Sequence, residues 1–328
     1  MAYDLDFEKP LAELEKKISG LQRKGERLKA EERTQLQQLE QELYKRTEEI
    51  YKNLTTWQTV QISRHKDRPY SLDYLKLMCD DFFELHGDRC FGDDPAIVAG
   101  PGMLNGTRVM FLCQQKGRDL KERMHRNNGM PHPEGYRKTY RLLQQAEKFG
   151  MPVISLIDVS GASVALIDEE RGQHEAIAAN LYLMARLRTP MIAAIIGEGG
   201  SGGALAIGIA DRILMMEHSY YTVAAPEAAA SIMWRDSAFA PQAAEAMQIS
   251  AKGLQPMGII DEIVPEPLGG AHRNHNQAAE NLKVALQKNL EEIKAIPIDQ
   301  LVECRYQKFR KIGKFARAED SVISQTSH

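Results

Sequence analysis

The sequence predicts an α/β protein built around a mostly parallel sheet. Apolar runs typical of buried strands alternate with amphipathic helical segments from residue 135 onward, and a two-strand hairpin precedes them. Strands separated by helices pair in parallel and have both faces covered. The composition agrees, because 43% hydrophobic and 27% charged residues in a chain of 328 are ordinary values for a folded domain.

The N-terminal segment, residues 10–56, is rich in Glu, Lys, Arg and Gln and predicts two helices. Apolar residues recur at helical spacing in two stripes, Leu11, Leu14, Ile18 and Leu21 in the first and Leu36, Leu39, Leu43, Ile50 and Leu54 in the second. Gly20 and Gly25 separate the two. We expect an antiparallel helical hairpin whose stripes are covered by each other, by the rest of the chain or by a partner.

The sheet opens at Ala96, where Asn105-Gly106 joins two apolar runs and gives the sequence signal of a two-residue hairpin turn. The following pattern predicts helices over 135–150, 170–188 and 201–211, and strands over 151–158, 190–197, 212–217 and 220–225. Short helices over 226–234, 240–247 and 250–258, a strand over 259–265 and a helical segment from 275 to about 312 complete the chain, before a frayed tail over 317–328. The helix over 201–211, about ten residues long, is too short to span a doubly wound sheet.

Charge and cysteine usage exclude several classes of protein. The formal net charge is −3, so no overall field favours nucleic acid or an anionic membrane. The cysteines, Cys79, Cys90, Cys113 and Cys304, show neither a C-x-x-C pair nor metal-ligand spacing, so we expect no metal site and a reducing compartment. The sequence has no secretory n-region and no apolar run of about 18 residues. A cytoplasmic protein is expected, with no nucleic-acid or membrane partner.

A glycine-rich stretch at 197–208 follows an apolar run and permits two interpretations. Gly197, Gly199 and Gly202 satisfy G-x-G-x-x-G, and Glu217 lies 20 residues after the first glycine, which is the dinucleotide-binding fingerprint. Alternatively, Gly202 and Gly203 open a helix with bare backbone N–H groups that hold a developing negative charge in an acyl-transfer site.

Several blocks in fixed order resemble one family. They are "RPYSLDY" at 68–74, "QQKGRDLKE" at 114–122, "GMPHPEGYRK" at 129–138, "EERGQHEAIAANL" at 169–181, "GEGGSGGALAIG" at 197–208 and "IVPEPLGGAHRN" at 263–274. Over nearly its whole length the chain resembles the alpha subunits of bacterial acetyl-CoA carboxylase carboxyltransferase. The resemblance implies a crotonase-like (ClpP/crotonase) fold of β-β-α units at 57–274, with the N-terminal hairpin at 1–56 and a C-terminal helical segment and tail at 275–328.

The resemblance also implies the chemistry and the partners. The family transfers a carboxyl group from carboxybiotin, carried by a biotin carrier protein, to acetyl-CoA, and the malonyl-CoA formed enters fatty acid synthesis. A zinc-bearing beta subunit shares the active site, so this chain itself needs neither metal nor bound cofactor. "EAM" at 245–247 is similar to a biotin-attachment motif, but Gln248 stands where the modified lysine would be. This chain is therefore not expected to carry biotin.

The family resemblance favours the second interpretation of the glycines. In a dinucleotide-binding domain the fingerprint follows the first strand of the unit, whereas two strand–helix passages precede Gly197 here. By resemblance, Gly202 and Gly203 are the catalytic pair that binds the biotin carbonyl, and the beta subunit supplies the corresponding pair for the enolate. Gly199 and Gly208 are interpreted as positions of close helix–strand packing.

Two charged groups have open roles. Lys116 and Arg118 belong to a basic segment that could bind CoA phosphates, pair with acids on the beta subunit or remain solvated, and we expect a ligand or interface role. His272 invites a role as a general base, with Arg273 beside it. The reaction does not need such a base, since decarboxylated biotin can take the proton, so a structural role at a subunit contact is favoured.

The chain departs from the family at two loops. After "ISLID" the family pattern is T-P-G-A-Y-P-G, whereas this chain reads "VSGASVA" over 159–165, where Gly161, Ala162 and Ser163 are expected to line the biotin pocket opposite Gly202. Ala228, also assigned to this pocket, replaces a family glycine, and alanine is strained there if that glycine has a positive φ. Two alternatives follow: a working alpha subunit, or a weak or inactive paralogue that assembles beside a second alpha-type subunit.

Overall fold

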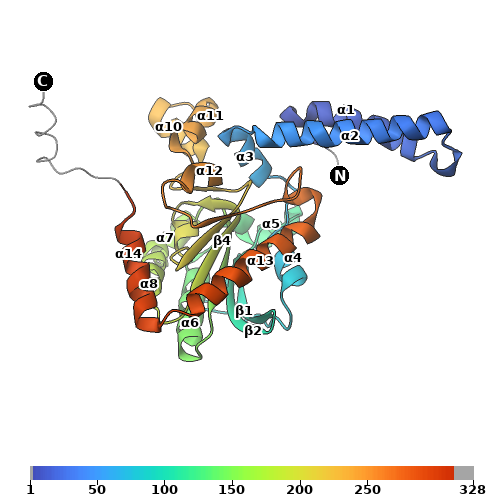
Figure 1. Cartoon of the computed structure of the whole chain (residues 1–328). Coiled ribbons are helices and arrows are strands. Elements are labelled where there is room, and N and C mark those ends of the chain that lie inside the picture. Colours follow the sequence, from blue (N-terminus) through green and yellow to red (C-terminus); the bar gives the residue numbers. More distant parts are fainter. Residues whose placement is uncertain (1–2, 314–328) are drawn as a thin grey trace, which may run out of the picture.

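The computed structural model describes residues 3–313 as a sheet covered on both faces, with a helical hairpin that projects to one side (Figure 1). The strands are β1 (Ile97–Leu104), β2 (Thr107–Gln114), β3 (Val153–Val159), β4 (Met191–Gly200), β5 (Arg212–Met216), β6 (Tyr220–Thr222) and β7 (Glu262–Val264). They form a seven-stranded sheet in the order β1-β2-β3-β4-β5-β7, with β6 paired to β4. Only β1 and β2 are antiparallel, so the prediction of a mostly parallel sheet is confirmed.

The turn between β1 and β2 has the predicted geometry. Leu104 pairs with Thr107, and the two residues between them have φ of 45° at Asn105 and 77° at Gly106. A type I′ turn requires positive φ at both central residues, and asparagine and glycine tolerate it best. The turn therefore fixes the register of the hairpin from local sequence alone.

The helices lie around this sheet. They are α1 (Lys9–Gln22), α2 (Ala30–Lys52), α3 (Thr56–Ser63), α4 (Ser71–Met78), α5 (Leu120–His125), α6 (Pro133–Lys148), α7 (Leu166–Glu170), α8 (Gln173–Arg186), α9 (Ser201–Leu205), α10 (Pro226–Trp234), α11 (Ala240–Met247), α12 (Ala251–Leu254), α13 (His275–Lys294) and α14 (Ile298–Arg310). Short 3-10 turns are η1 (Asp6–Glu8), η2 (Gly25–Arg27), η3 (Asn127–Gly129), η4 (Ser237–Phe239) and η5 (Ala271–Arg273).

Each face of the sheet has its own apolar core. Helices α6 and α8 cover one face together with Val153 of β3 and Ala193 of β4, whereas α4 and α13 cover the other with Ile154 and Ile192. Successive side chains of a strand point to opposite faces, so continuous apolar strands supply both cores. Because α13 shares a core with the sheet, the C-terminal helical segment is packed onto the central domain.

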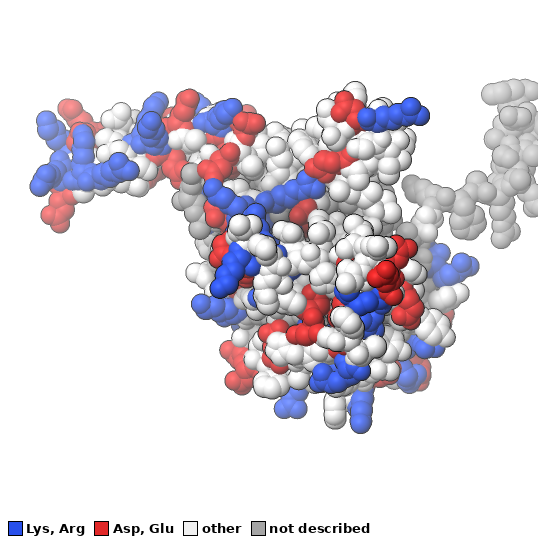
Figure 2. All heavy atoms as spheres, turned by 180° about the vertical axis from the view of Figure 1, so that it is seen from behind, with Lys and Arg blue, Asp and Glu red and all other residues white. Residues whose placement is uncertain are grey.

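The N-terminal segment contains two helices, α1 and α2, that pack against each other. Leu11, Leu14 and Ile18 of α1 are buried, and the second stripe on α2 is half-buried. Arg273 reaches Glu15 at 3.1 Å and so links the hairpin to the body. On the face seen in Figure 2, acidic and basic residues are intermixed along this projection and do not form one basic surface.

One predicted helix is shorter in the structure. The helix expected over 201–211 ends at Leu205, because the carbonyl of Gly203 leaves the helical ladder and accepts the Gln114 amide at 2.7 Å. The segment expected to be helical from 275 to about 312 consists of two helices, since Pro297 cannot continue α13. The predicted tail over 317–328 lies outside the described residues. Within 3–313, no helix combines the length and the apolar character that a membrane span requires.

Candidate active site

The glycine turn at the end of β4 has an uncommon backbone. Ser201 links β4 to α9 with φ of 50°, and Gly200 lies so close to the loop after β3 that a β-carbon there would come within 2.0 Å of the Ser160 carbonyl oxygen. The carbonyl of Gly202 accepts the Ala206 N–H at 2.9 Å. Among residues 3–313, no hydrogen bond uses the N–H of Gly202 or Gly203. Neither N–H has a partner within this part of the chain, and Gly203 is buried whereas Gly202 is partly exposed.

Five of the predicted site residues line one cavity of about 590 Å³: Gly161, Ala162, Ser163, Gly202 and Ala228. Its walls come from the loop after β3, the first turn of α9 and the segment between β6 and α10. Gly203 lies behind this wall, where a β-carbon would come within 2.6 Å of the backbone of Gly161 and Ala162. At Gly202, by contrast, the nearest atom to such a β-carbon is Ile177 Cδ1 at 3.6 Å. Of the two glycines, Gly202 is the one with open space beside it.

Ala228 carries no backbone strain. It lies in the first turn of α10 and is not among the residues with positive φ. The condition under which alanine would be strained is therefore not met, and the side chain adds only a methyl group to the cavity wall.

Lys116 lies outside this cavity, in a buried ion network. Its ammonium is 2.6 Å from both Asp158 Oδ1 and Glu198 Oε1, and Glu198 also accepts Arg64 at 2.8 Å and the Tyr220 hydroxyl at 2.5 Å. Burial acts to raise the pKa of Glu198, but Lys116 and Arg64 outweigh it and lower that pKa to about 2. Burial would lower the pKa of Lys116, and the two carboxylates raise it instead. Lys116, Arg64 and Glu198 are therefore charged at neutral pH, and each of them lies against a group of opposite charge.

Arg118 is also engaged within the chain. Its guanidinium pairs with Asp73, lies 4.5 Å from the centre of the Tyr70 ring and donates to the Lys66 carbonyl at 3.1 Å. It lines neither the cavity beside Gly202 nor the smaller, charged cavity that borders Lys116. The structure therefore does not bring Lys116 and Arg118 together with the glycine pair.

His272 and Arg273 lie at the base of the N-terminal hairpin. The His272 ring stacks on His65 with 4.0 Å between centroids, and burial together with His65 lowers the pKa of His272 to about 3. Arg273 covers the Tyr3 ring at 4.0 Å. Arg273 thus contacts the N-terminal segment of the same chain, whereas the His65 partner of His272 lies just after α3, and neither His272 nor Arg273 lines the cavity beside Gly202.

Sequence reasoning missed the residues that surround and support the glycine turn. Asp158, Glu198, Arg64 and Tyr220 complete the ion network, and the buried Gln114 holds the carbonyl of Gly203 and the N–H of Asp158. A signal was present in the sequence, because Asp158 and Glu198 are acids at the ends of otherwise apolar strands. A buried acid needs a partner, and Lys116 is that partner.

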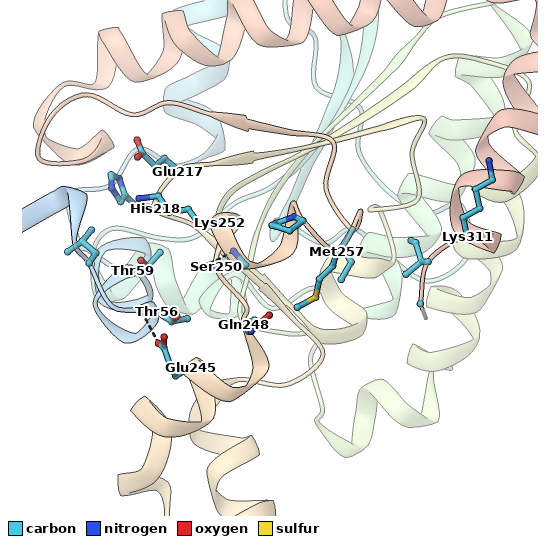
Figure 3. A pocket seen from close by; sticks show the side chains of 16 residues that line it. Thr56, Thr59, Glu217, His218, Glu245, Gln248, Ser250, Lys252, Met257 and Lys311 are labelled. Atoms are coloured by element: carbon cyan, nitrogen blue, oxygen red, sulfur yellow. Dashed lines mark hydrogen bonds between the residues drawn. The ribbon is translucent and has the colours of Figure 1, made fainter. Parts of the chain in front are cut away.

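A larger cavity of about 1050 Å³ lies elsewhere, between α3, α11, α12 and the segment 311–313 that follows α14 (Figure 3). It contains none of the predicted site residues. Glu217, the acid of the dinucleotide fingerprint, lines this cavity and accepts the Glu266 N–H at 3.3 Å. The acid therefore does not share a cavity with Gly202, as that interpretation would need. Within 3–313, no cluster of histidine, cysteine and acidic side chains is arranged to hold a metal ion.

A family model described as acetyl co-enzyme A carboxylase carboxyltransferase-like matches residues 4–313. The chain belongs to this carboxyltransferase family. An acetyl-coenzyme A carboxylase carboxyl transferase subunit alpha of Geobacter metallireducens is 54% identical over 96% of this chain and 98% of its own length. The alpha subunit of Anoxybacillus flavithermus is 49% identical over 98% of this chain and 99% of its own length. These matches along the whole chain do not favour an assembly-only paralogue.

Several solved structures share the fold at low sequence identity. A transcarboxylase 12S structure has a TM-score of 0.56 at 16% identity, covering 76% of this chain and 43% of its own. A Pseudomonas malonate decarboxylase hetero-tetramer has a TM-score of 0.55 at 18% identity, covering 72% and 90%. The fold of this family member is crotonase-like, as the resemblance implied.

Proposed function

We propose that this chain is the alpha subunit of an acetyl-CoA carboxylase carboxyltransferase and supplies the biotin side of malonyl-CoA formation. The carboxyl donor is carboxybiotin on the biotin carrier protein, and the acceptor is acetyl-CoA. The observation that carries the proposal is that Gly202, with an N–H free of any partner in the described residues, lines one cavity with Gly161, Ala162, Ser163 and Ala228. The family match along the chain supports the same reaction.

The chemistry requires charge stabilisation more than proton transfer. When the N–C bond of carboxybiotin breaks, carbon dioxide leaves and negative charge develops on the ureido oxygen. The biotin nitrogen then takes a proton from the methyl group of acetyl-CoA, and the enolate formed in this way attacks carbon dioxide to make the new C–C bond. We assign the N–H groups of Gly202 and Gly203 to that oxygen. One such preorganised donor is typically worth about 3 to 4 kcal/mol in the transition state.

The remaining predicted residues are of two kinds: some line the cavity, and the others stabilise the structure beside it. Gly161, Ala162, Ser163 and Ala228 are proposed to contact the ring of biotin. Lys116 and Arg118 are proposed to stabilise the scaffold next to the site, because their cations are already paired with Asp158, Glu198 and Asp73. Binding of a CoA phosphate would have to break those pairs.

A partner surface surrounds the cavity. Val164 is 93% exposed and Val223 81% exposed at its rim, and Leu166, Ile232 and Met233 are exposed apolar side chains on α7 and α10. Contiguous exposed apolar surface is typical of protein interfaces. We propose that the zinc-bearing beta subunit covers it and completes the acetyl-CoA half of the site, in the cytoplasm and with the biotin carrier as a transient partner. In this arrangement 57–274 carries the chemistry, and 1–56 and 275–328 support assembly.

The test is coexpression with the beta subunit and assay of malonyl-CoA formation. We expect one hetero-oligomeric peak in size-exclusion chromatography and carboxyl transfer that needs both subunits. Gly202→Val should lower the rate by about 100-fold, because the added side chain keeps the ureido oxygen away from the N–H group and so removes the benefit of that donor, and it should leave the complex intact. Gly20→Val, in an open position on α1, is the matched control. Two separate peaks at micromolar concentration, or a normal rate in Gly202→Val, would contradict the proposal.

A further inference from the structure

Ser163 holds the loop after β3 in place, because its N–H, its carbonyl and its hydroxyl all form hydrogen bonds. Ser163 donates its N–H to the Pro131 carbonyl at 3.0 Å, accepts Gln173 Nε2 on its own carbonyl at 2.9 Å and donates its hydroxyl to Asp168 Oδ2. The side chain is buried, whereas the next residue, Val164, is 93% exposed. Ser163 is thus the point at which this loop is fastened to the rest of the chain.

Asp168, which accepts from Ser163, and Gln173, which donates to it, are each held by further hydrogen bonds. Asp168 is fully buried and also accepts His132 Nδ1–H at 2.7 Å and Arg171 at 2.8 Å. Gln173 is buried and donates a second hydrogen bond to the Pro131 carbonyl at 2.8 Å. Charge-assisted and mutually supporting hydrogen bonds of this kind hold a fixed geometry. The loop is therefore fastened to the chain entering α6, to α7 and to the start of α8.

This fastening determines where the cavity wall stands. Gly161 and Ala162 precede Ser163 directly and lie against Gly203, where a β-carbon would come within 2.6 Å of their backbone. Gly161, Ala162 and Ser163 then face Gly202 across the same cavity. Displacing Ser163 would move the wall relative to the glycine turn.

We propose that Ser163, Asp168 and Gln173 form a clamp that positions the loop 160–165 for carboxyl transfer. Asp168 and Gln173 are positioning residues, which act through the loop: Gln173 also lines the cavity, but its amide nitrogen is already donated to the Pro131 and Ser163 carbonyls. The clamp supplies by side-chain hydrogen bonds the stiffness that the two prolines of the T-P-G-A-Y-P-G pattern would supply through the backbone. This inference rests on the proposed function, and it explains how a chain without those prolines keeps a formed pocket.

The activity test uses the full chain assembled with the beta subunit, assayed in reverse with malonyl-CoA as the carboxyl donor and biocytin as the acceptor. Ser163→Ala and Asp168→Asn should lower kcat/KM for biocytin by about 10-fold or more, as for a lost hydrogen bond to a charged group, with KM for malonyl-CoA unchanged. Ser163→Thr restores the hydroxyl and should recover most of the loss. Thr34→Ala, which removes an exposed hydroxyl bonded to the Ala30 carbonyl on α2, controls for hydroxyl loss as such. Equal loss for both substrates, or no loss, would overturn the inference.

A second measurement does not depend on activity. Amide hydrogen exchange of the full-length chain should show protection at Ser163, whose N–H is bonded to Pro131, and exchange about 10-fold faster in Ser163→Ala and Gln173→Ala. The amides of α2 should be unchanged. If the wild-type complex is inactive but exchange changes as expected, the clamp stands and the proposed function fails. An unprotected loop in the wild type, or protection unchanged in both variants, removes the clamp whatever the activity.

Discussion

Two cavities share Ser160 as a lining residue, and they differ in what they can offer a ligand. The cavity beside Gly202 is lined mainly by small and apolar side chains and by Gly202 itself, whose backbone N–H binds nothing else in residues 3–313. The cavity beside Lys116 is lined by Arg64, Glu198 and other polar groups. Lys116, Arg64 and Glu198 already form ion pairs, so these three groups are less available to a ligand. For ligand binding, whether a polar group is free of other partners matters more here than the residue type to which it belongs.

The largest expected effect is on folding stability, and it tests whether the ion pairs of Lys116 stabilise the fold. Lys116→Met leaves Asp158 and Glu198 buried with less compensating charge, and removal of one partner from a buried ion pair costs about 3 to 5 kcal/mol. We expect a loss of that size in the free energy of unfolding, measured by urea denaturation. Lys121→Met, at an exposed lysine of α5, should change stability little. A stable Lys116→Met chain with weakened acetyl-CoA binding would instead make Lys116 a ligand residue and break the comparison.

The next effect separates the two glycines of the first cavity. Gly203→Ala forces a β-carbon against the backbone of Gly161 and Ala162 and should destabilise the chain by about 1 to 3 kcal/mol, as overpacking does. Gly202→Ala meets no atom closer than 3.6 Å and should fold normally. Thermal unfolding of both variants measures the difference. Equal stability would mean that the loop does not lie against Gly203.

The smallest expected effect is a pH dependence of folding stability, which comes from Glu198 in the charged cavity. The pKa of Glu198 is about 2, below its ordinary 4.5, so its contribution to stability is present above pH 4.5 and is lost as pH falls toward 2. At pH 3 the loss should be about 2 kcal/mol. Glu198→Gln should flatten this part of the curve of unfolding free energy against pH. A wild-type curve and a Glu198→Gln curve with equal slopes between pH 5 and 3 would show that Glu198 is not held ionised.

Local patterns predicted most of the fold. The Asn105-Gly106 turn, the apolar runs of β3 and β4 and the stripes of the N-terminal hairpin depend on neighbours in sequence, and each was found where expected. The length of α9 could not be predicted in this way. It ends early because Gln114, from a strand far earlier in the chain, takes the carbonyl of Gly203.

The candidate site was predicted in part for the same reason. The sequence marks Gly202 and the loop over 161–163, and the structure brings them to one cavity. It does not reveal that Lys116 and Arg118 are already paired, because their partners Asp158, Glu198 and Asp73 come from distant segments. The clamp on Ser163 is hidden likewise, since Gln173 acts through a hydrogen bond to a backbone carbonyl that no residue pattern encodes.

Strand β4 pairs with β5 along its first half and with β6 near its end, and this pairing affects how the residues of such a site can change. The first half of β4 pairs with β5, its last three residues, Glu198 to Gly200, pair with β6, and Gly199 pairs with Val159 of β3 on the other edge. The strand that presents the glycines is therefore bordered on both edges almost to its end, whereas the facing loop is fastened through side chains. Natural variation or protein engineering can therefore substitute residues of the loop one at a time and change which ligand ring fits the cavity. The strand does not have to change with it.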